Sequence, residues 1–431
     1  MPTSAELQVR RAAAIPRGIG HVTQIYAKRA KNSEIWSEDG KRYIDFGAGI
    51  AVVNTGHQHP KLVAAIKDQL EAFTHVCFQV TPYENYVSLA ERLNAIAPVI
   101  GPAKTMLAST GAEAVENAVK VARAFTGRPG IISFSGGFHG RTHMGMALTG
   151  KVVPYKKGFG PFPPEIYNVA FPNEYHGVST AGSLDSLKAL FKYTADPSTI
   201  AAIIIEPVQG EGGFNIVPKD FMVTLRKLCD DHGILLIADE IQTGFARTGK
   251  MFAMEHYGIK ADVVTLAKGL AGGMPLSAIT GRADVMDASN PGGLGGTYAG
   301  NPVACAAAHA VLDVIAEEKL CDRAKAIGKI IMDRCDDLKN LSNLNCIGDV
   351  RGLGAMCAIE LVKDATSGEP SPEITAALLK AARDRGLILL SCGTYGNVVR
   401  FLVPLTASDA LVREGMDIFA TSMTEAVANA S

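Results

Sequence analysis

Short apolar runs alternate with segments of helical periodicity between about residues 60 and 285. Five runs have the length and continuous apolarity of strands buried on both faces: residues 104–109, 131–134, 201–205, 234–238 and 263–267. Between two of them, Phe221, Leu225 and Leu228 recur at helical spacing and predict a helix that begins at Pro218 and ends at Gly233. The pattern predicts an α/β fold with a mostly parallel, doubly wound sheet covered by helices.

The pattern changes after about residue 325. A long helix, short strands and a closing helix from Ser408 predict a smaller α/β domain, with the strands at residues 355–361, 387–391 and 398–403. The chain before residue 60 contains one predicted strand, residues 43–46. We therefore expect three parts: an N-terminal segment that packs with the small domain (1–60), a large domain (61–325) and a small C-terminal domain (326–431).

The composition indicates a packed globular protein with a small-molecule partner. Hydrophobic residues make up 47% of the chain and the net charge is −1, without runs of like charge, so we expect neither a nucleic-acid nor a membrane partner. The eight cysteines include no C-x-x-C pair, which argues against a zinc site and a disulfide framework. The first twenty residues lack a long apolar stretch, so a cytoplasmic protein is expected.

Charged side chains directly follow two of the predicted strands. Residues 235–238 lead into Asp239 and Glu240, and residues 263–267 lead into Lys268. Ligands of open parallel sheets bind beyond the carboxyl ends of the strands. A lysine whose pKa is lowered by burial there is suited to imine formation, and a neighbouring carboxylate is suited to hold the protonated ring nitrogen of a pyridoxal cofactor.

A third feature fits the same cofactor. Residues 109–113 combine glycine and small side chains at a strand-to-helix turn, where free N–H groups favour a phosphate. Each feature alone has an ordinary explanation, as a carboxylate that caps a turn, a solvated lysine or a common helix start. The combination predicts pyridoxal phosphate.

Two competing motifs are weaker. Gly145 to Lys151 nearly matches the phosphate loop of nucleoside triphosphatases, but Val152 replaces the required Ser or Thr and Pro154 opposes a following helix. His139 and His143 have metal-like spacing, yet the glycines around them argue against a helix that presents both, and a third ligand is not evident. We expect no metal site. His57 and His59, just before Pro60, equally fit a turn.

The chain resembles the class-III (subgroup III) aminotransferases of pyridoxal-phosphate fold type I, among them the bacterial 4-aminobutyrate aminotransferases. The resemblance runs from about Arg10 to the closing helix. It rests on eight stretches: residues 15–18, 49–57, 110–117, 134–142, 206–213, 238–242, 266–269 and 292–301.

The resemblance implies a complete cofactor site. It implies that Lys268 holds pyridoxal phosphate covalently and then carries the proton, that Asp239 contacts the ring nitrogen, and that Gln242 lies beside the ring hydroxyl. Further cofactor contacts are implied for Gly111, Ala112, Phe138, His139, Ile241 and Thr297. Thr297 matches a residue supplied by the other subunit, so the family implies a homodimer with shared sites, which can pair further into a tetramer.

Two arginines carry the implied substrate recognition. Arg141 matches the residue that holds the distal carboxylate, and Arg400 matches the one that holds the α-carboxylate of glutamate. Glu211 matches the partner of Arg400 when the substrate lacks an α-carboxylate. Ile50 matches a residue that narrows the pocket, and Glu206 a carboxylate beside it.

The implied reaction is a ping-pong transfer of the amino group of 4-aminobutyrate to 2-oxoglutarate, which yields succinate semialdehyde and L-glutamate. A donor such as 5-aminovalerate or ornithine remains an alternative, because one methylene changes binding by only about 1–3 kcal/mol. An aminomutase of the same fold and a nucleotide-binding module are further alternatives. The former conflicts with the implied roles of Arg141, Glu211 and Arg400, which suit two alternating substrates.

Overall fold

The computed structural model describes residues 2–341 and 344–430. Its main element is a seven-stranded sheet in the order β4-β12-β11-β10-β7-β5-β6. These strands are β4 (Ala103–Ala108), β5 (Gly130–Phe134), β6 (Ile166–Val169), β7 (Ile200–Ile205), β10 (Leu235–Asp239), β11 (Val263–Leu266) and β12 (Ser277–Arg282). All pairs are parallel except the two made by β12, which is antiparallel to both neighbours. The predicted mostly parallel sheet is confirmed, although β6 and β12 were not predicted.

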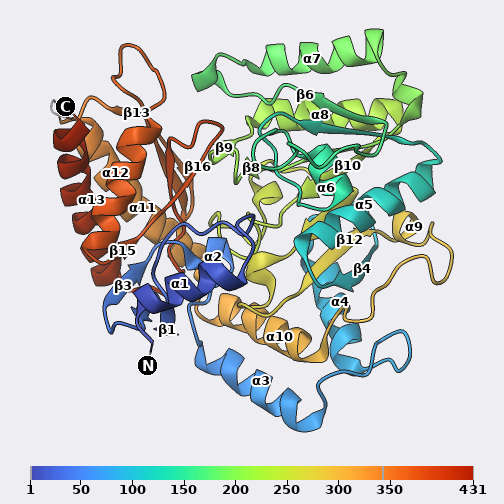
Figure 1. Ribbon diagram of the computed structural model, residues 1–431. Helices are drawn as coiled ribbons and strands as arrows, with labels where there is room; N and C mark the ends of the chain where they lie inside the picture. Colours follow the sequence, from blue (N-terminus) through green and yellow to red (C-terminus); the bar gives the residue numbers. More distant parts are fainter. Residues whose placement is uncertain (1, 342–343, 431) are drawn as a thin grey trace.

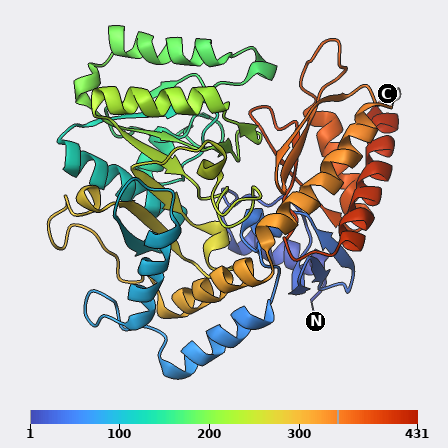
Figure 2. The same ribbon diagram turned by 180° about the vertical axis from the view of Figure 1, so that it is seen from behind.

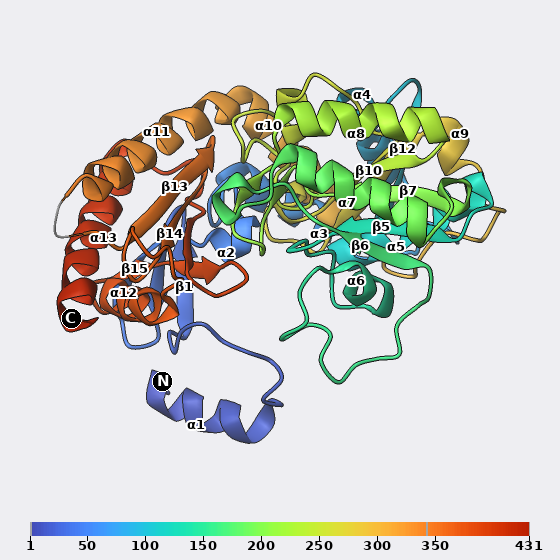
Figure 3. The same ribbon diagram turned by 90° about the horizontal axis from the view of Figure 1, so that it is seen from above.

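Helices cover both faces of this sheet, as Figure 3 shows. Along β7, Ile203 and Ile205 pack with α7 (Thr180–Tyr193) and α8 (Lys219–His232). Ile204 points to the other face and packs with α5 (Gly111–Thr126) and α6 (His143–Leu148). Burial on both faces explains why these strands read as continuous apolar runs.

The helix between Pro218 and Gly233 forms as predicted. Pro218 is the N-cap residue of α8, and Gly233 ends it in the left-handed conformation (φ +62°). Near the lower edge of the molecule, α10 packs against α3 and α4 (Figure 2). The remaining helices before residue 320 are α1 (Ser4–Ala14), α2 (Ala48–Ala51), α3 (Pro60–Ala72), α4 (Glu84–Ile96), α9 (Ala283–Met286) and α10 (Pro302–Glu317), with short 3₁₀ turns at Glu174–His176, Pro197–Thr199, Ala253–His256 and Lys268–Leu270.

A second sheet lies beside the first (Figure 1). It is antiparallel, with the order β13-β14-β17-β16, and α11 (Leu320–Lys339), α12 (Pro372–Asp384) and α13 (Asp409–Ala430) cover one face. Its strands are β13 (Ile347–Leu353), β14 (Met356–Leu361), β16 (Leu390–Cys392) and β17 (Val398–Phe401). Strand β13 was not predicted, because its charged residues and glycines interrupt the apolar pattern.

The predicted single strand at residues 387–391 is wrong. Residues Leu387–Ile388 form β15, which pairs in parallel with β3 (Arg42–Asp45), whereas β16 pairs with β17 in the second sheet. Leu389, between them, is buried, so the apolar run continues while the chain passes from one sheet to the other. An apolar run therefore predicts that its residues are buried, but not the sheet to which they belong.

The N-terminal part contacts the C-terminal part of the chain through the pairing of β3 with β15. Strands β1 (Ala27–Lys31), β2 (Glu34–Ser37) and β3 form an antiparallel meander. Helix α1 contributes no buried residue and stands apart from the rest (Figure 3). The boundaries at residues 60 and 325 stay a prediction. In the described part of the chain, every helix falls short of the length and apolarity that a membrane span requires.

Candidate active site

A cavity of about 540 Å³ lies where β10 and β11 end and α5 begins. It brings together eleven of the residues expected there from the sequence: Gly111, Ala112, Phe138, His139, Arg141, Glu206, Glu211, Asp239, Ile241, Gln242 and Lys268. Three others do not line it within this chain. Arg400 reaches it through Glu211, Ile50 lies on an exposed turn, and Thr297 is exposed.

Lys268 follows β11 in the first position of a 3₁₀ turn and has a positive φ of +42°. Its side chain keeps some accessible surface because it lines the cavity, but protein atoms surround it. This burial lowers the pKa of the Lys268 amine to about 8, and the charge of Arg400 acts in the same direction, against that of Glu211. A neutral amine is therefore within reach near neutral pH.

Asp239 ends β10 and is held on both carboxylate oxygens. Oδ2 lies 2.7 Å from His139 Nδ1, and Oδ1 accepts hydrogen bonds from Thr265 Oγ1 (3.1 Å) and from the N–H of Ile241 (3.2 Å). Burial opposes the charged form of His139, but the hydrogen bond to Asp239 and the charges of Asp239 and Glu206 outweigh it and raise the pKa. The site thus contains a buried, oriented negative charge.

The adjacent carboxylate, that of Glu240, has a structural role. Glu240 points away from the cavity and accepts hydrogen bonds from the N–H groups of Ala253 (3.0 Å) and Met254 (2.7 Å). Of the two carboxylates that follow the strand, Glu240 holds a 3₁₀ turn, and Asp239 faces the cavity.

Glu206 connects two backbone segments around the cavity. Oε1 accepts from the N–H of Phe138 (2.8 Å), and Oε2 accepts from the N–H of Gly210 (2.9 Å). Burial raises the pKa of Glu206 to about 7, while the His139 charge and these donors act against the rise.

The N-terminus of α5 leaves two N–H groups without an acceptor. Thr110 and Glu113 form a capping box: Thr110 Oγ1 accepts from the N–H of Glu113, and Glu113 Oε2 accepts from the N–H groups of Ser109 and Thr110 (both 2.8 Å). In the described part of the chain, nothing accepts from the N–H groups of Gly111 and Ala112. These two groups lie at the positive end of the helix dipole, where their donors are free for an anion.

Glu211 and Arg400 form an ion pair of 2.6 Å at the cavity wall. Arg400 comes from β17 and is buried, whereas Glu211 lies in the turn of a hairpin formed by β8 (Val208–Gln209) and β9 (Asn215–Ile216). Burial alone would raise the pKa of Glu211, but the charge and hydrogen bond of Arg400 lower it, and Glu211 is ionised at neutral pH.

Arg141 is held by aromatic rings. Its guanidinium carbon lies 5.4 Å from the centre of the Phe138 ring and 5.3 Å from that of Tyr155. The two rings are themselves 4.9 Å apart. Within the described residues it has no carboxylate partner, so its donors are available to a ligand. Tyr155 was not predicted, since nothing in its irregular segment marks it.

Ile50 lies on a turn of unusual backbone conformation. The four residues 48–51 have φ values of +45°, +61°, +66° and +59°, and only one of them is glycine. Asp45 Oδ1 accepts the N–H groups of Gly47 (2.8 Å) and of the next residue (3.0 Å), and Oδ2 lies 2.8 Å from His57 Nε2. His57 was considered only as a turn residue, and its pairing with Asp45 was missed.

The competing sequence motifs do not form sites. Gly145 lies inside α6, and that helix precedes Lys151, where a phosphate loop would have a helix follow. The described residues contain no cluster of His, Cys, Asp and Glu that could hold a metal ion. His139 is bound to Asp239, whereas His143 begins α6.

Comparisons with known proteins identify the family of the chain. The sequence profile of the family Aminotransferase class-III matches residues 15–423. The chain is 54% identical to the 5-aminovalerate aminotransferase DavT of Pseudomonas putida, over 96% of this chain and 97% of that one. It is 53% identical to the 4-aminobutyrate aminotransferase GabT of Escherichia coli, over 99% of this chain and all of that one.

A solved structure shares the fold over nearly its whole length. The amine transaminase from an uncultivated Pseudomonas species, in its internal aldimine form with bound pyridoxal phosphate, matches with a TM-score of 0.87 and 30% identity, covering 97% of this chain and 99% of that one. The family profile, the two relatives and the shared fold each extend over almost all of the sequence. The chain belongs to the class-III aminotransferases.

Proposed function

We propose that the chain is a pyridoxal-phosphate-dependent aminotransferase that moves the amino group of 4-aminobutyrate to 2-oxoglutarate, giving succinate semialdehyde and L-glutamate. One observation carries the substrate assignment. The cavity that contains Lys268 is lined by one arginine free to bind a carboxylate, Arg141, and by Glu211, which balances the charge of Arg400 behind it. A donor with one carboxylate fits this arrangement without leaving a charge unpaired.

The residues of the cavity fit the cofactor at three points. The free N–H groups of Gly111 and Ala112 suit its phosphate. Asp239 supplies a buried negative charge for the ring nitrogen, and Gln242 Oε1 is buried without a hydrogen-bond partner in the described chain, as an acceptor for the ring hydroxyl would be. Phe138 and Ile241 supply apolar surface for the faces of the ring.

The protein's part in the chemistry is to position groups and to move a proton. Bound pyridoxal phosphate supplies an electron-withdrawing ring that stabilises the carbanion formed at the substrate carbon. Lys268 Nζ would carry the proton from the substrate carbon to the cofactor carbon that takes over the amino group, which a lysine with a pKa of about 8 can do near neutral pH. Asp239, oriented by His139 and Thr265, keeps the proton on the ring nitrogen.

Glu211 adapts one pocket to two substrates. With 4-aminobutyrate, Arg141 binds the carboxylate and Glu211 stays on Arg400. With glutamate or 2-oxoglutarate, the α-carboxylate takes the place of Glu211 on Arg400. The resemblance assigns Ile50 a position that narrows the pocket, but its side chain lies on an exposed turn and does not line the cavity within this chain. Glu206 acts through the backbone of Phe138 and Gly210, because both of its oxygens accept from those N–H groups.

5-Aminovalerate is the second candidate donor. The relative named for that substrate is 54% identical to this chain and the relative named for 4-aminobutyrate 53%, so identity does not separate them. Both donors carry a single carboxylate and differ by one methylene, which is worth about 1–3 kcal/mol.

We also propose a cytoplasmic homodimer. All eight cysteines are free thiols, which supports a reducing compartment. Thr297 lies outside its own chain's cavity on an exposed segment, which supports a contact with the cofactor of the partner subunit.

The test is a comparison of four amines with 2-oxoglutarate as the acceptor: 4-aminobutyrate, 5-aminovalerate, ornithine and putrescine. We expect the highest kcat/KM with 4-aminobutyrate, and no turnover by Lys268→Ala with any of them. A higher kcat/KM for 5-aminovalerate would change the donor but not the reaction. An active Lys268→Ala variant would contradict the proposed chemistry.

A further inference from the structure

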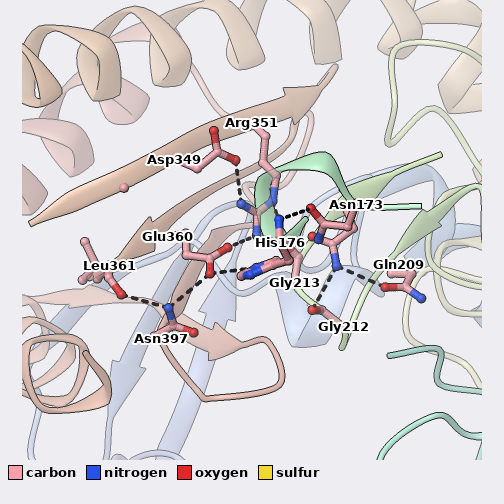
Figure 4. A network of polar contacts seen from close by, with 12 residues as sticks. Asn173, His176, Gln209, Gly212, Gly213, Asp349, Arg351, Glu360, Leu361 and Asn397 are labelled. Atoms are coloured by element: carbon pink, nitrogen blue, oxygen red, sulfur yellow. Dashed lines mark hydrogen bonds and ion pairs between the residues drawn. The ribbon is translucent and has the colours of Figure 1, made fainter. Parts of the chain in front are cut away.

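The hairpin that carries Glu211 is fastened to the second sheet at its backbone. The Gly213 carbonyl oxygen accepts two hydrogen bonds from Arg351, one from Nε (2.9 Å) and one from Nη2 (2.6 Å). Arg351 lies on β13 and is 138 residues away in the sequence. Its side chain is only 13% exposed. Figure 4 shows this contact within a wider polar network.

Arg351 is itself fixed by two carboxylates. Nη1 donates to Asp349 (2.7 Å), and Nη2 donates to Glu360 (2.8 Å). Glu360 is buried on β14 and is also 3.0 Å from His176 Nε2 and 3.3 Å from Asn397 Nδ2. With its conformation fixed in this way, Arg351 presents a rigid pair of donors to Gly213.

Arg351 and Arg400 lie in one cross-strand register on the same face of the second sheet, and both contact the hairpin. Arg351 lies opposite Ala358 on β14, and Ala358 lies opposite Arg400 on β17. Residues directly opposite each other in antiparallel strands share a face, so both guanidinium groups project toward the hairpin. Phe214 of the hairpin is fully buried and belongs to an apolar cluster with Ala358.

The two contacts differ in what the reaction requires of them. The Arg400 contact is to the Glu211 side chain and must open whenever an α-carboxylate binds. The Arg351 contact is to the backbone two residues further on and need never open. A second cavity, of about 320 Å³, borders the hairpin and Glu360, so the hairpin is not closely packed on this side.

We propose that Arg351 is a positioning residue for the substrate exchange: it fixes the hairpin backbone, so that Glu211 leaves and regains Arg400 by rotation of its side chain alone. The proposal rests on the function proposed above. Without Arg351 the hairpin moves when Glu211 is released, and ordering it again opposes the return of Glu211. The half-reaction with 4-aminobutyrate, which needs Glu211 on Arg400, suffers, whereas the half-reaction with glutamate does not.

The experiment is a double-mutant cycle on the holoenzyme. Single-turnover rates with 4-aminobutyrate and with L-glutamate are read from the cofactor absorbance for the wild type, Arg351→Gln, Glu211→Ser and the double variant. We expect Arg351→Gln to slow the 4-aminobutyrate half-reaction about tenfold and the glutamate half-reaction less than about twofold. In the Glu211→Ser background, the same replacement should change the 4-aminobutyrate rate less than about twofold.

Two further variants keep the test independent of folding. Arg351→Lys retains the charge beside Glu360 and Asp349, and should keep part of the 4-aminobutyrate rate. Arg226→Lys is the matched control for Arg351→Lys, because Arg226, on α8, is similarly buried (10% exposed) and pairs with a carboxylate, that of Asp262. It should change both half-reactions equally or not at all.

Equal losses in both half-reactions of Arg351→Gln, or a loss that persists in the Glu211→Ser background, would overturn the proposal. The same selective loss in Arg226→Lys would also overturn it. A wild type without any 4-aminobutyrate half-reaction would overturn the proposed function together with this inference. A reacting wild type whose variants show no coupling overturns the inference alone.

Discussion

Lys268 acts as an amine, and its protonation state decides when it can react. Four charged groups surround it. Glu211, Glu206 and Asp239 favour the ammonium form and Arg400 opposes it, but burial dominates and brings the pKa of Lys268 to about 8. In the unfolded chain the pKa of a lysine is about 10.5. The buried side chain is therefore neutral over a range of pH in which an exposed lysine is charged.

A pH dependence follows for the cofactor-free protein. We expect the rate at which it combines with pyridoxal phosphate to rise with pH through about 8 and to level off about one unit higher, as measured by stopped-flow absorbance. Between pH 8 and 10.5 the unfolded chain binds the proton and the folded chain does not, so the contribution of Lys268 to the free energy of unfolding rises with pH. Lys268→Met should remove both effects. A rate of cofactor binding that does not change with pH below 8 would contradict the low pKa of Lys268.

Tyr155 is expected to act on substrates through Arg141. Replacing its ring with leucine removes a cation–π contact worth about 0.5–2 kcal/mol, so Tyr155→Leu should raise KM for 4-aminobutyrate by about 2- to 30-fold with a smaller effect on kcat. Tyr155→Phe keeps the ring and serves as the control. Steady-state kinetics with an amine that lacks a carboxylate should show no change. Equal effects of the Phe and Leu variants would exclude a role of the ring.

Residues differ in how far the sequence predicts them. Lys268 and Asp239 each follow an apolar strand, so their proximity follows from parallel pairing, which the structure confirms between β10 and β11. Tyr155 and Arg351 lie in segments without a distinctive pattern, and the stretch that ends at His57 does not indicate its contact with Asp45. Arg351 meets Gly213 only because the hairpin of β8 and β9 packs against β13, and spacing along the sequence does not encode that contact.

At the scale of elements, the strongest predictions concern those buried on both sides. Strands β5, β7, β10 and β11 lie within a residue or two of their predicted bounds, because helices on both faces require continuous apolarity. The antiparallel β12 and the half-exposed β13 escaped prediction. Their pairing partners, and not their own composition, make them strands.

The capping box of α5 connects helix stability to cofactor binding. Glu113→Ala removes the acceptor for the N–H groups of Ser109 and Thr110, and should lower the free energy of unfolding by about 1 kcal/mol. The same change loosens the turn that presents the two free N–H groups, so the dissociation constant of pyridoxal phosphate should rise. Urea unfolding and cofactor titration measure the two effects. Thr126→Ala, at the other end of the helix, should leave cofactor affinity unchanged.

At the scale of the whole molecule, Thr297 tests whether the site is shared. We expect dimers that combine one Lys268→Ala subunit with one Thr297→Ala subunit to contain one fully native site, because both changes then fall in the other site. The purified mixed dimers should contain half as many sites of normal cofactor affinity as the wild type, and should show half its activity. If Thr297 served its own chain, neither site of the mixed dimer would be native, and normal-affinity sites would be missing.

The left-handed turn of residues 48–51 bears on which substitutions the enzyme tolerates. Elsewhere in the molecule, enlarging a pocket removes packed atoms and weakens the fold. At Ile50 the side chain is 42% exposed and φ is +66°, a conformation that costs a non-glycine residue about 1–2 kcal/mol. Glycine there relieves that cost while losing about 0.5–1 kcal/mol to the greater freedom of the unfolded chain. Ile50→Gly should therefore not lower the melting temperature. On the proposed role of Ile50 beside the substrate, it should also accept bulkier donors, so selection for new substrates can begin here without a compensating mutation.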